Sequence, residues 1–368
     1  MPELTTVPWF AASQPYSSIY DIHYMILSIF DSTRETSVVV NNFGKNIGPA
    51  NGECDDRFGS PFLWNSACSV FSVVKMACFA TRVLGLTCQR PSSGRFFAAA
   101  VNPRRISRRF EELAAQRTSG FIAYVTAGDP SLEATLAVAY ALESAGVDIL
   151  ELGIPFSDPL ADGPTIQAAS NRALAAGMTV SGSLEIVRRF RANSELPLVL
   201  FTYLNPIYAY GFERFLSDAV RAGADGLLIL DLPPDEAEQN SELIFSGGLD
   251  PIRLIAPTTP PGRMAKIVAT GRGFIYYVSR EGVTGEQSRL SDSISAQVAE
   301  LRRHTSLPIA VGFGISTLEQ ASTVARQADA VVVGSAVVRQ IAENGNSPDL
   351  AKHVRDFVRP LVQATKSA

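Results

Sequence analysis

Three observations predict an α/β fold, a single (β/α)8 barrel formed by residues 101–368. Eight short, apolar, β-rich segments recur in this part of the chain, about every 20–50 residues. Stretches with apolar residues at i, i+3 and i+4 lie between them, as in amphipathic helices. The β-rich segments are apolar throughout rather than alternating, which is typical of strands covered on both faces. Eight repeats without a dinucleotide-binding fingerprint favour a closed barrel over a doubly wound sheet.

The predicted elements follow one another in a regular order along the chain. VNPRRISRRFEELAAQ (101–116) contains the first predicted helix, which precedes the first strand. SLEATLAVAYALESAG (131–146) and TLEQASTVARQ (317–327) are examples of the helical spacing between strands. The eight predicted strands are residues 121–126, 148–153, 196–203, 224–233, 252–257, 273–279, 308–314 and 328–335.

Residues 1–100 differ from the barrel region because they show no sustained helix or strand period. Residues 57–110 contain nine Lys or Arg and no Asp or Glu, a composition that resembles an organellar transit peptide. Against this, the first 56 residues contain seven acids. We predict an N-terminal extension with three open interpretations: disordered upstream sequence from a mis-assigned start, a targeting segment, or an added region of unknown role.

The overall composition argues against several classes of function. The formal net charge of −4 gives no electrostatic footprint for nucleic acid or an anionic membrane. The most hydrophobic stretch, residues 62–86, is interrupted by polar and charged side chains and is a poor membrane span. Three scattered histidines and four cysteines with spacings of 14, 10 and 10 fit no metal motif, so we expect no metal site. We expect a cytoplasmic location, or a plastid if residues 1–100 contain a transit peptide.

The segment DILELGIPFSDPLADGPTIQ (148–167) carries the first candidate chemistry. Glu151 stands near the end of the predicted second strand, and barrel enzymes place active groups at the carboxyl ends of strands. Loss of solvent there raises a carboxyl pKa and suits the group to general acid–base work. Neutralisation by a nearby Arg or Lys, or a capping role, is the alternative for Glu151. In the following loop Asp158 fits an Asx turn, whereas Asp162 lies far enough along to fold back over the strand mouth.

Glycine-containing turns follow the last three predicted strands, in GVTGEQ (282–287), VGFGIS (311–316) and VVVGSAVV (331–338). Glycines let backbone N–H groups approach an anion closely, and a helix N-terminus after the eighth strand adds its dipole. This is the usual phosphate site of (β/α)8 barrels. The sequence therefore predicts a phosphate-bearing ligand, with simple turn glycines as the alternative.

Seven segments within about residues 104–345 carry a family resemblance. They are FIAYVTAGDP, ELGIPFSDPLADGPTIQ, YLNPIYAYG, LILDLPPDE, SREGVTGE, VGFGIST and VVVGSAVV. In this order they resemble the α subunit of tryptophan synthase, and the second segment is the most specific of them. Residues 1–100 have no counterpart in the family pattern.

The resemblance implies cleavage of indole-3-glycerol phosphate to indole and glyceraldehyde 3-phosphate in tryptophan biosynthesis. This retro-aldol reaction uses no cofactor and no metal. The bond breaks only after the indole ring is protonated at C3, and a side-chain hydroxyl must lose a proton, so two acid–base groups are needed. By resemblance, Glu151 transfers protons near C3 and the glycerol hydroxyl, and Asp162 faces the indole nitrogen. Tyr276 corresponds to the aromatic residue beside them and is the third predicted catalytic residue, with a barrel-core role as its alternative.

The resemblance also implies the substrate contacts. Residues 155–163 and 280–288 correspond to the family's mobile lids, where Thr284 would hydrogen-bond Asp162 on closure. The residues predicted to form an apolar slot for the indole ring are Tyr124, Phe201, Tyr203 and Leu228. The residues predicted to hold the phosphate are Gly285, Gly314, Gly334 and Ser335, with Phe313 between strand and ligand.

A protein partner is implied as well. The family's β subunit, a pyridoxal-phosphate protein, docks near the barrel mouth and receives indole through a tunnel, so the resemblance implies an α2β2 complex. Residues 203–211 and 231–234 are the expected contact segments, and pyridoxal phosphate belongs to the partner. A stand-alone lyase that releases free indole and a non-catalytic partner of the β subunit are the alternatives. The intact Glu151 and Asp162 argue against the non-catalytic alternative.

Overall fold

The computed structural model describes residues 104–279, 287–312 and 314–368, so the N-terminal extension lies outside the described residues. Eight parallel strands pair in sequence order, and the last pairs with the first to close a barrel. All eight overlap the predicted segments, which confirms the (β/α)8 fold. The strands are β1 (Gly120–Thr126), β2 (Ile149–Gly153), β3 (Leu198–Thr202), β4 (Gly226–Ile229), β5 (Asp250–Ile255), β6 (Ile275–Val278), β7 (Ile309–Gly312) and β8 (Ala330–Val333).

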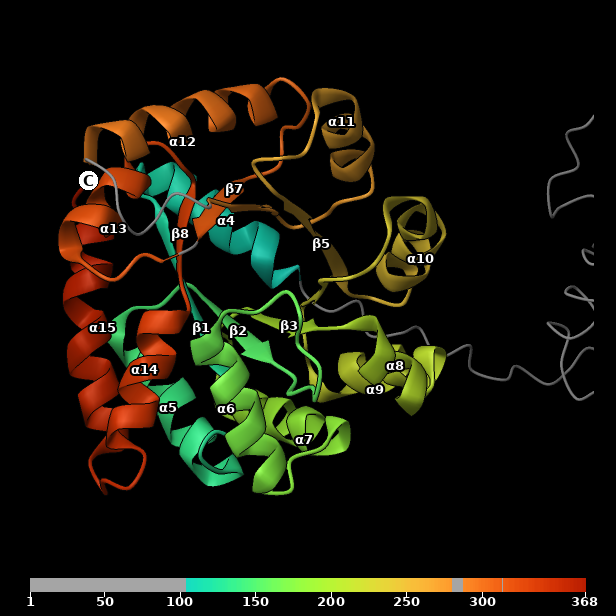
Figure 1. Cartoon of the computed structure of the whole chain (residues 1–368), viewed down its shortest axis with the longest axis vertical. Coiled ribbons are helices and arrows are strands. Elements are labelled where there is room, and N and C mark those ends of the chain that lie inside the picture. The colour runs from blue at the N-terminus through green and yellow to red at the C-terminus, as the bar shows by residue number, and fades with distance from the viewer. Residues whose placement is uncertain (1–103, 280–286, 313) are drawn as a thin grey trace, which may run out of the picture. The chain divides into compact units, whose positions relative to one another are not determined.

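Helices surround the strands in a ring (Figure 1). Side-chain caps fix several of their starts: Ser131 accepts a hydrogen bond from the N–H of Ala134 at α5, and Thr317 forms a capping box with Gln320 at α13. The described helices are α4 (Arg105–Gln116), α5 (Leu132–Ala145), α6 (Pro164–Ala175), α7 (Val180–Arg191), α8 (Leu204–Tyr210), α9 (Phe212–Ala222), α10 (Pro234–Ser246), α11 (Pro261–Ala269), α12 (Gln287–Arg302), α13 (Leu318–Ala325), α14 (Ser335–Asn344) and α15 (Leu350–Lys366).

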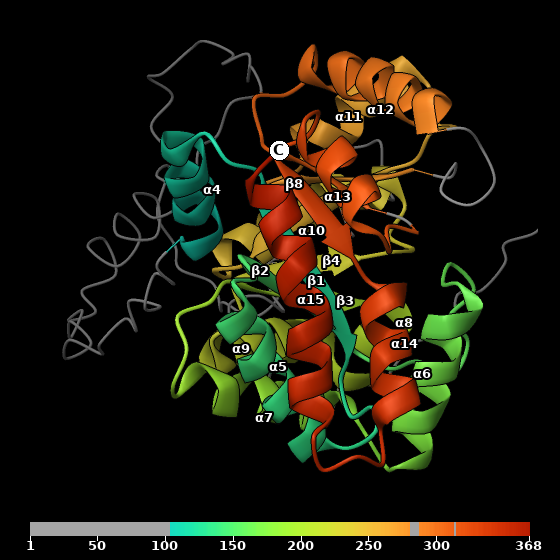
Figure 2. The same cartoon turned by 90° about the vertical axis from the view of Figure 1, so that its left-hand side faces the viewer.

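One apolar cluster fills the barrel interior, and α4 closes one end of it. Ile106, Phe110 and Leu113 of this helix are buried among the inward-facing strand residues. Leu113 and Ile106 lie against Gly120 and Gly226, the first residues of β1 and β4. In Figure 1 α4 crosses the centre of the ring, and in the turned view of Figure 2 it lies to one side of the strands. The amino-terminal end of the barrel is therefore closed, and the carboxyl-terminal end remains for chemistry.

Aspartates join neighbouring strands at the amino-terminal end. Asp148, Asp225 and Asp329 each directly precede a strand and accept a hydrogen bond from a backbone N–H at the start of the strand before it, at 2.7, 2.9 and 2.8 Å. Asp225 also accepts hydrogen bonds from Arg105 Nη1 and Arg191 Nη2, both at 2.9 Å. Burial raises the pKa of Asp225, and the charges of Arg191 and Arg105 oppose that rise. These hydrogen bonds connect neighbouring strands and α4 at this end of the barrel.

Candidate active site

Glu151 occupies the middle of β2, and its side chain is fully buried. It pairs in register with Tyr124 of β1 and Val199 of β3. Neither carboxylate oxygen has a hydrogen-bond partner among the described residues, so no described Arg or Lys neutralises it. Desolvation raises the pKa of Glu151 to about 8, and the group therefore holds a proton at neutral pH.

Asp162 lies on the loop that follows β2 and is half-buried. The hydroxyl of Tyr203, directly after β3, donates a hydrogen bond to Asp162 Oδ2 at 3.0 Å. The same hydroxyl accepts a hydrogen bond from the backbone N–H of Ala161, also at 3.0 Å. Desolvation raises the pKa of Asp162 to about 6, and the bond from Tyr203 opposes the rise. Asp162 is therefore ionised at neutral pH, in contrast to Glu151.

Aromatic and apolar side chains line the space near the two carboxylates. The rings of Tyr124 and Phe201 meet edge to face with centroids 5.2 Å apart, and Phe201 pairs in register with Leu228. Desolvation, followed by the charge of Glu151, raises the pKa of Tyr276, and the charge of the loop aspartate adds to the rise. The structure thus brings both predicted carboxylates together with the predicted aromatic residues at one end of the barrel.

Two strand glycines make room for these tyrosines. A Cβ atom on Gly153 of β2 would collide with the hydroxyl of Tyr124. A Cβ atom on Gly312 of β7 would collide with the hydroxyl of Tyr276. Sequence analysis gave neither glycine this packing role, although an isolated glycine inside a strand pattern is a known signal for a close approach.

The predicted phosphate end includes the start of α14. Gly334 precedes this helix, Ser335 is its first residue, and no side chain caps it, as in most of the described helices. The first backbone N–H groups of a helix have no partner within the helix and are suited to bind an anion. Gly314, after β7, has φ +71°, which favours glycine. The remaining predicted residues of this end and of the second lid, Thr284, Gly285 and Phe313, lie outside the described residues.

Sequence analysis also missed two residues that hold the loop of Asp162. Gln167 donates a hydrogen bond from Nε2 to the backbone carbonyl oxygen of Asp162 at 2.9 Å. The ring of Phe156 packs on Tyr203 with centroids 5.3 Å apart. The sequence did carry a signal for Gln167. Gly163 and Pro164 mark the start of a helix, which places Gln167 in the first turn of α6, beside the loop.

Among the described residues, no group of three or more His, Cys, Asp or Glu side chains could hold a metal ion. Within the same part of the chain, no helix is long and apolar enough to cross a membrane.

The fold and the site define a class of protein: a (β/α)8-barrel enzyme with two carboxylates of unlike pKa at its carboxyl-terminal end. Comparison with known proteins narrows this class. A family model described as "Tryptophan synthase alpha chain" matches residues 110–366. The tryptophan synthase alpha chain of Opitutus terrae is 51% identical over 263 residues, 71% of this chain and 99% of the relative. That of Citrifermentans bemidjiense is 51% identical over 259 residues, 70% and 97% of the two chains.

Solved structures agree with the sequence comparisons. The crystal structure of tryptophan synthase subunit alpha from Legionella pneumophila matches with a TM-score of 0.67 and 40% identity, over 72% of this chain and 99% of the other. A chain of tryptophan synthase from M. tuberculosis matches with a TM-score of 0.65 and 33% identity, over 71% and 98%. This chain belongs to the tryptophan synthase alpha chain family.

Proposed function

We propose that this chain cleaves indole-3-glycerol phosphate to indole and glyceraldehyde 3-phosphate with Glu151 and Asp162 as its two proton-transferring groups. Family membership assigns the lyase reaction of tryptophan biosynthesis. The family uses no cofactor for it, and pyridoxal phosphate belongs to the β subunit. The observation that carries the residue assignment is the unlike protonation of two carboxylates at one end of the barrel.

The two carboxylates suit opposite tasks at neutral pH. Glu151, with a pKa of about 8, carries a proton that it can donate to C3 of the indole ring. The resulting carboxylate then accepts the proton of the glycerol hydroxyl as the carbon–carbon bond breaks. Asp162, with a pKa of about 6, is ionised and can accept a hydrogen bond from the indole N–H, which stabilises the positive charge on the protonated ring.

The other predicted residues fit parts of the substrate. Tyr124, Phe201 and Leu228 supply an apolar wall for the indole ring, and Tyr276 lies beside the acids. The uncapped start of α14, at Ser335, supplies N–H donors for the phosphate. Holding the two ends of the substrate fixes C3 at the proton donor.

The family works with a β subunit, and we assign the docking surface to residues 203–211 and 231–234 in an α2β2 complex. Two large hydrophobic side chains near this end are exposed: Leu160 at 91% and Tyr208 at 53%. Asp231 accepts a hydrogen bond from the backbone N–H of Leu204 at 2.7 Å, which joins the two segments. A stand-alone lyase is the competing function. Copurification with a β subunit and strong rate activation by it support docking, whereas full turnover without it favours the stand-alone lyase.

We assign catalysis to residues 101–368 and treat residues 1–100 as an extension outside the catalytic unit. The family match begins at residue 110, and relatives align over nearly their whole length with about 70% of this chain. A cytoplasmic location is proposed on the same comparison, because these relatives are of bacterial type.

An indole-release assay on two loop variants tests the assignment. Asp162→Asn removes the negative charge near the indole nitrogen and is expected to lower kcat by about 10²–10⁴-fold. Asp158→Asn is the matched control, because Asp158 is exposed on the same loop. Its rate should stay near that of the unmodified chain. A near-normal rate for Asp162→Asn, or equal losses for the two variants, would contradict the proposed role.

A further inference from the structure

The hydroxyl of Tyr124 is a buried polar group that the proposed mechanism leaves unused. Tyr124 lies in β1, in register with Glu151 of β2, and is only 5% exposed. Thr126 Oγ1 donates a hydrogen bond to this hydroxyl at 3.5 Å, which is long for two oxygens. The hydroxyl forms no other hydrogen bond among the described residues. A buried donor without an acceptor costs free energy unless a bound ligand accepts its proton.

The surroundings of the ring place Tyr124 in the middle of the proposed site. A Cβ atom on Gly153 would collide with the hydroxyl, two residues beyond Glu151 toward the carboxyl-terminal end of the barrel. A Cβ atom on Gly334, which precedes α14, would lie 3.4 Å from the Cβ atom of Tyr124. The Tyr124 ring also meets Phe201 of the indole wall, with centroids 5.2 Å apart. Tyr124 therefore lies between the parts of the site proposed for the phosphate and for the indole ring.

The hydroxyl of Tyr124 is also close to both proposed catalytic carboxylates. Desolvation raises the pKa of Tyr124, and the charges of Asp162 and Glu151 add to the rise. The Coulomb interaction weakens with distance, so both acids lie near this hydroxyl. With its pKa raised, the hydroxyl keeps its proton at neutral pH and can donate a hydrogen bond.

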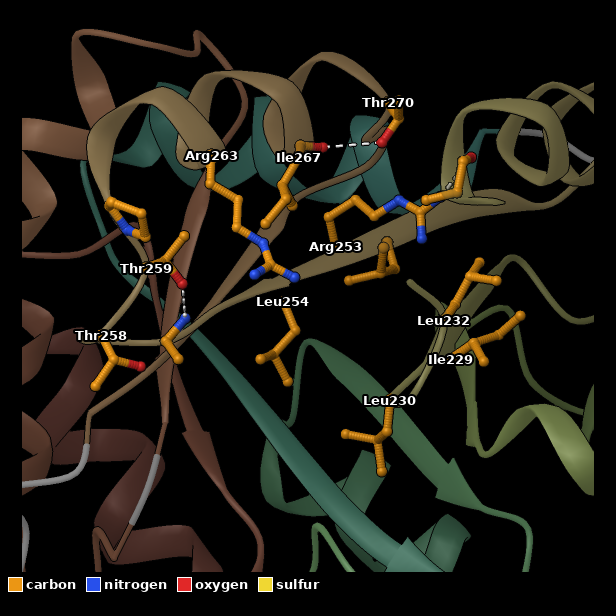
Figure 3. Close-up of a pocket in the computed structure, with 14 residues that line it drawn as sticks. Ile229, Leu230, Leu232, Arg253, Leu254, Thr258, Thr259, Arg263, Ile267 and Thr270 are labelled. Atoms are coloured by element: carbon orange, nitrogen blue, oxygen red, sulfur yellow. Dashed lines mark hydrogen bonds between the residues drawn. The ribbon is translucent and has the colours of Figure 1, made fainter. Parts of the chain in front are cut away.

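The side of the site over β4 and β5 presents apolar side chains to the barrel interior. Leu254 of β5 pairs in register with Tyr276, and Leu230, directly after β4, packs on the inward-facing strand residues. Both leucines line a cavity of about 300 Å³ (Figure 3). Neither leucine can bond to a substrate hydroxyl, so these positions suit the flat apolar ring. A polar part of the substrate finds a donor on the β1 side, at Tyr124.

We propose that the hydroxyl of Tyr124 donates a hydrogen bond to a hydroxyl oxygen of the substrate's glycerol side chain and thereby selects a hydroxylated side chain. This side chain joins the indole ring to the phosphate, so it passes between Phe201 and Gly334, where Tyr124 lies. A glycerol oxygen accepts the unused proton, whereas a plain alkyl chain leaves the donor unpaired. The inference rests on the proposed lyase function, because it concerns the substrate of that reaction.

Binding of two ligands to the Glu151→Gln variant, in which turnover is slowed, tests the proposal. Indole-3-glycerol phosphate carries the side-chain hydroxyls, and indole-3-propanol phosphate lacks both. In calorimetric titrations, adding Tyr124→Phe keeps the ring and should weaken the glycerol ligand about fivefold without weakening the propanol ligand. Tyr140→Phe is the matched control, because the Tyr140 hydroxyl donates to the carbonyl oxygen of Arg189 at 3.1 Å, between α5 and α7. This control should change neither affinity.

The outcomes separate this inference from the lyase function itself. Equal weakening of both ligands by Tyr124→Phe, or weakening of neither, would overturn the inference and leave the lyase function in place. Absence of binding of both ligands to Glu151→Gln would contradict the two together. In the otherwise unmodified chain, Tyr124→Phe should lower kcat/KM about fivefold and leave both limbs of the pH–rate profile in place. A moved limb would show that the hydroxyl acts through Glu151 or Asp162, and would also overturn the inference.

Discussion

The two ends of the barrel treat their carboxylates in opposite ways, and β2 shows the contrast within four residues. Asp148, directly before the strand, accepts a backbone hydrogen bond at 2.7 Å and pairs with Lys366 Nζ at 2.7 Å. Glu151, three residues later on the same chain segment, is fully buried with neither oxygen bonded among the described residues. One acid supports the fold, and the other is kept at an energetic cost.

The two ends of the barrel therefore have different roles: one stabilises the fold, and the other carries the chemistry. The amino-terminal end is closed by α4 and cross-linked by satisfied polar groups, which stabilises the barrel independently of the site. The carboxyl-terminal end holds an unpaired acid whose raised pKa is useful for proton transfer. Such a departure from polar satisfaction is typical of a functional site.

Among the proposed variants, Glu151→Gln should change activity most. The amide cannot transfer a proton, so kcat for indole release should fall by about 10²–10⁴-fold. Thermal stability should stay equal or rise, because a buried neutral amide replaces a group that is costly to ionise. Activity assays and thermal melts on one preparation measure both effects. A stable variant with near-normal turnover would refute the catalytic role, and a strongly destabilised variant would refute the claim that Glu151 is unsupported.

Asp225→Asn, at the amino-terminal end, should lower the stability of the chain and leave its activity almost unchanged. Loss of the charge leaves Arg105 and Arg191 without their shared carboxylate, and we expect about 3 kcal/mol less free energy of unfolding. Denaturant titration measures the loss. The kcat of the folded variant should remain within about twofold of the original chain, since a structural change at this end leaves transition-state contacts intact. A large drop in kcat without loss of stability would show that the two ends are not separable.

The raised pKa of Glu151 also makes the free energy of unfolding depend on pH. Glu151 titrates near pH 4.5 when unfolded and near pH 8 when folded, so the folded chain binds more protons between these values. Its contribution to the free energy of unfolding therefore falls as pH rises from about 4.5 to about 8. Glu151→Gln should remove this decline. Glu195→Gln is the control, because Glu195 is exposed and Arg105 lowers its pKa, so the decline should persist. Identical pH profiles for the unmodified chain and Glu151→Gln would rule out the raised pKa.

Sequence reasoning predicted most of this arrangement because its signals are local. Apolar runs revealed the strands, and the second of these runs predicted Glu151 as an acid on a barrel strand, although Glu151 lies in the middle of β2 rather than near its end. The partner of Asp162 was not predictable in this way, since Tyr203 follows another strand and its hydroxyl meets the loop only in the folded barrel. Sequence analysis predicted Tyr203 as an indole contact and as the first residue of a β-subunit contact segment, but not as the partner of Asp162.

The hydrogen bonds between the hydroxyl of Tyr203 and the loop of Asp162 should have the smallest effect on activity. Tyr203→Phe keeps the ring against Phe156 but removes the hydroxyl that donates to Asp162 and accepts from Ala161. Loss of a hydrogen bond to a charged group is worth about 1.5 kcal/mol, which corresponds to about tenfold in kcat/KM. That bond lowers the pKa of Asp162, so its removal should also move the acidic limb of the pH–rate profile to higher pH. Tyr208→Phe is the control in an assay without the β subunit, because Tyr208 is exposed and its loss of a hydroxyl should then shift neither quantity. A slower Tyr203→Phe variant with an unmoved acidic limb would mean that Tyr203 acts on the substrate rather than through Asp162.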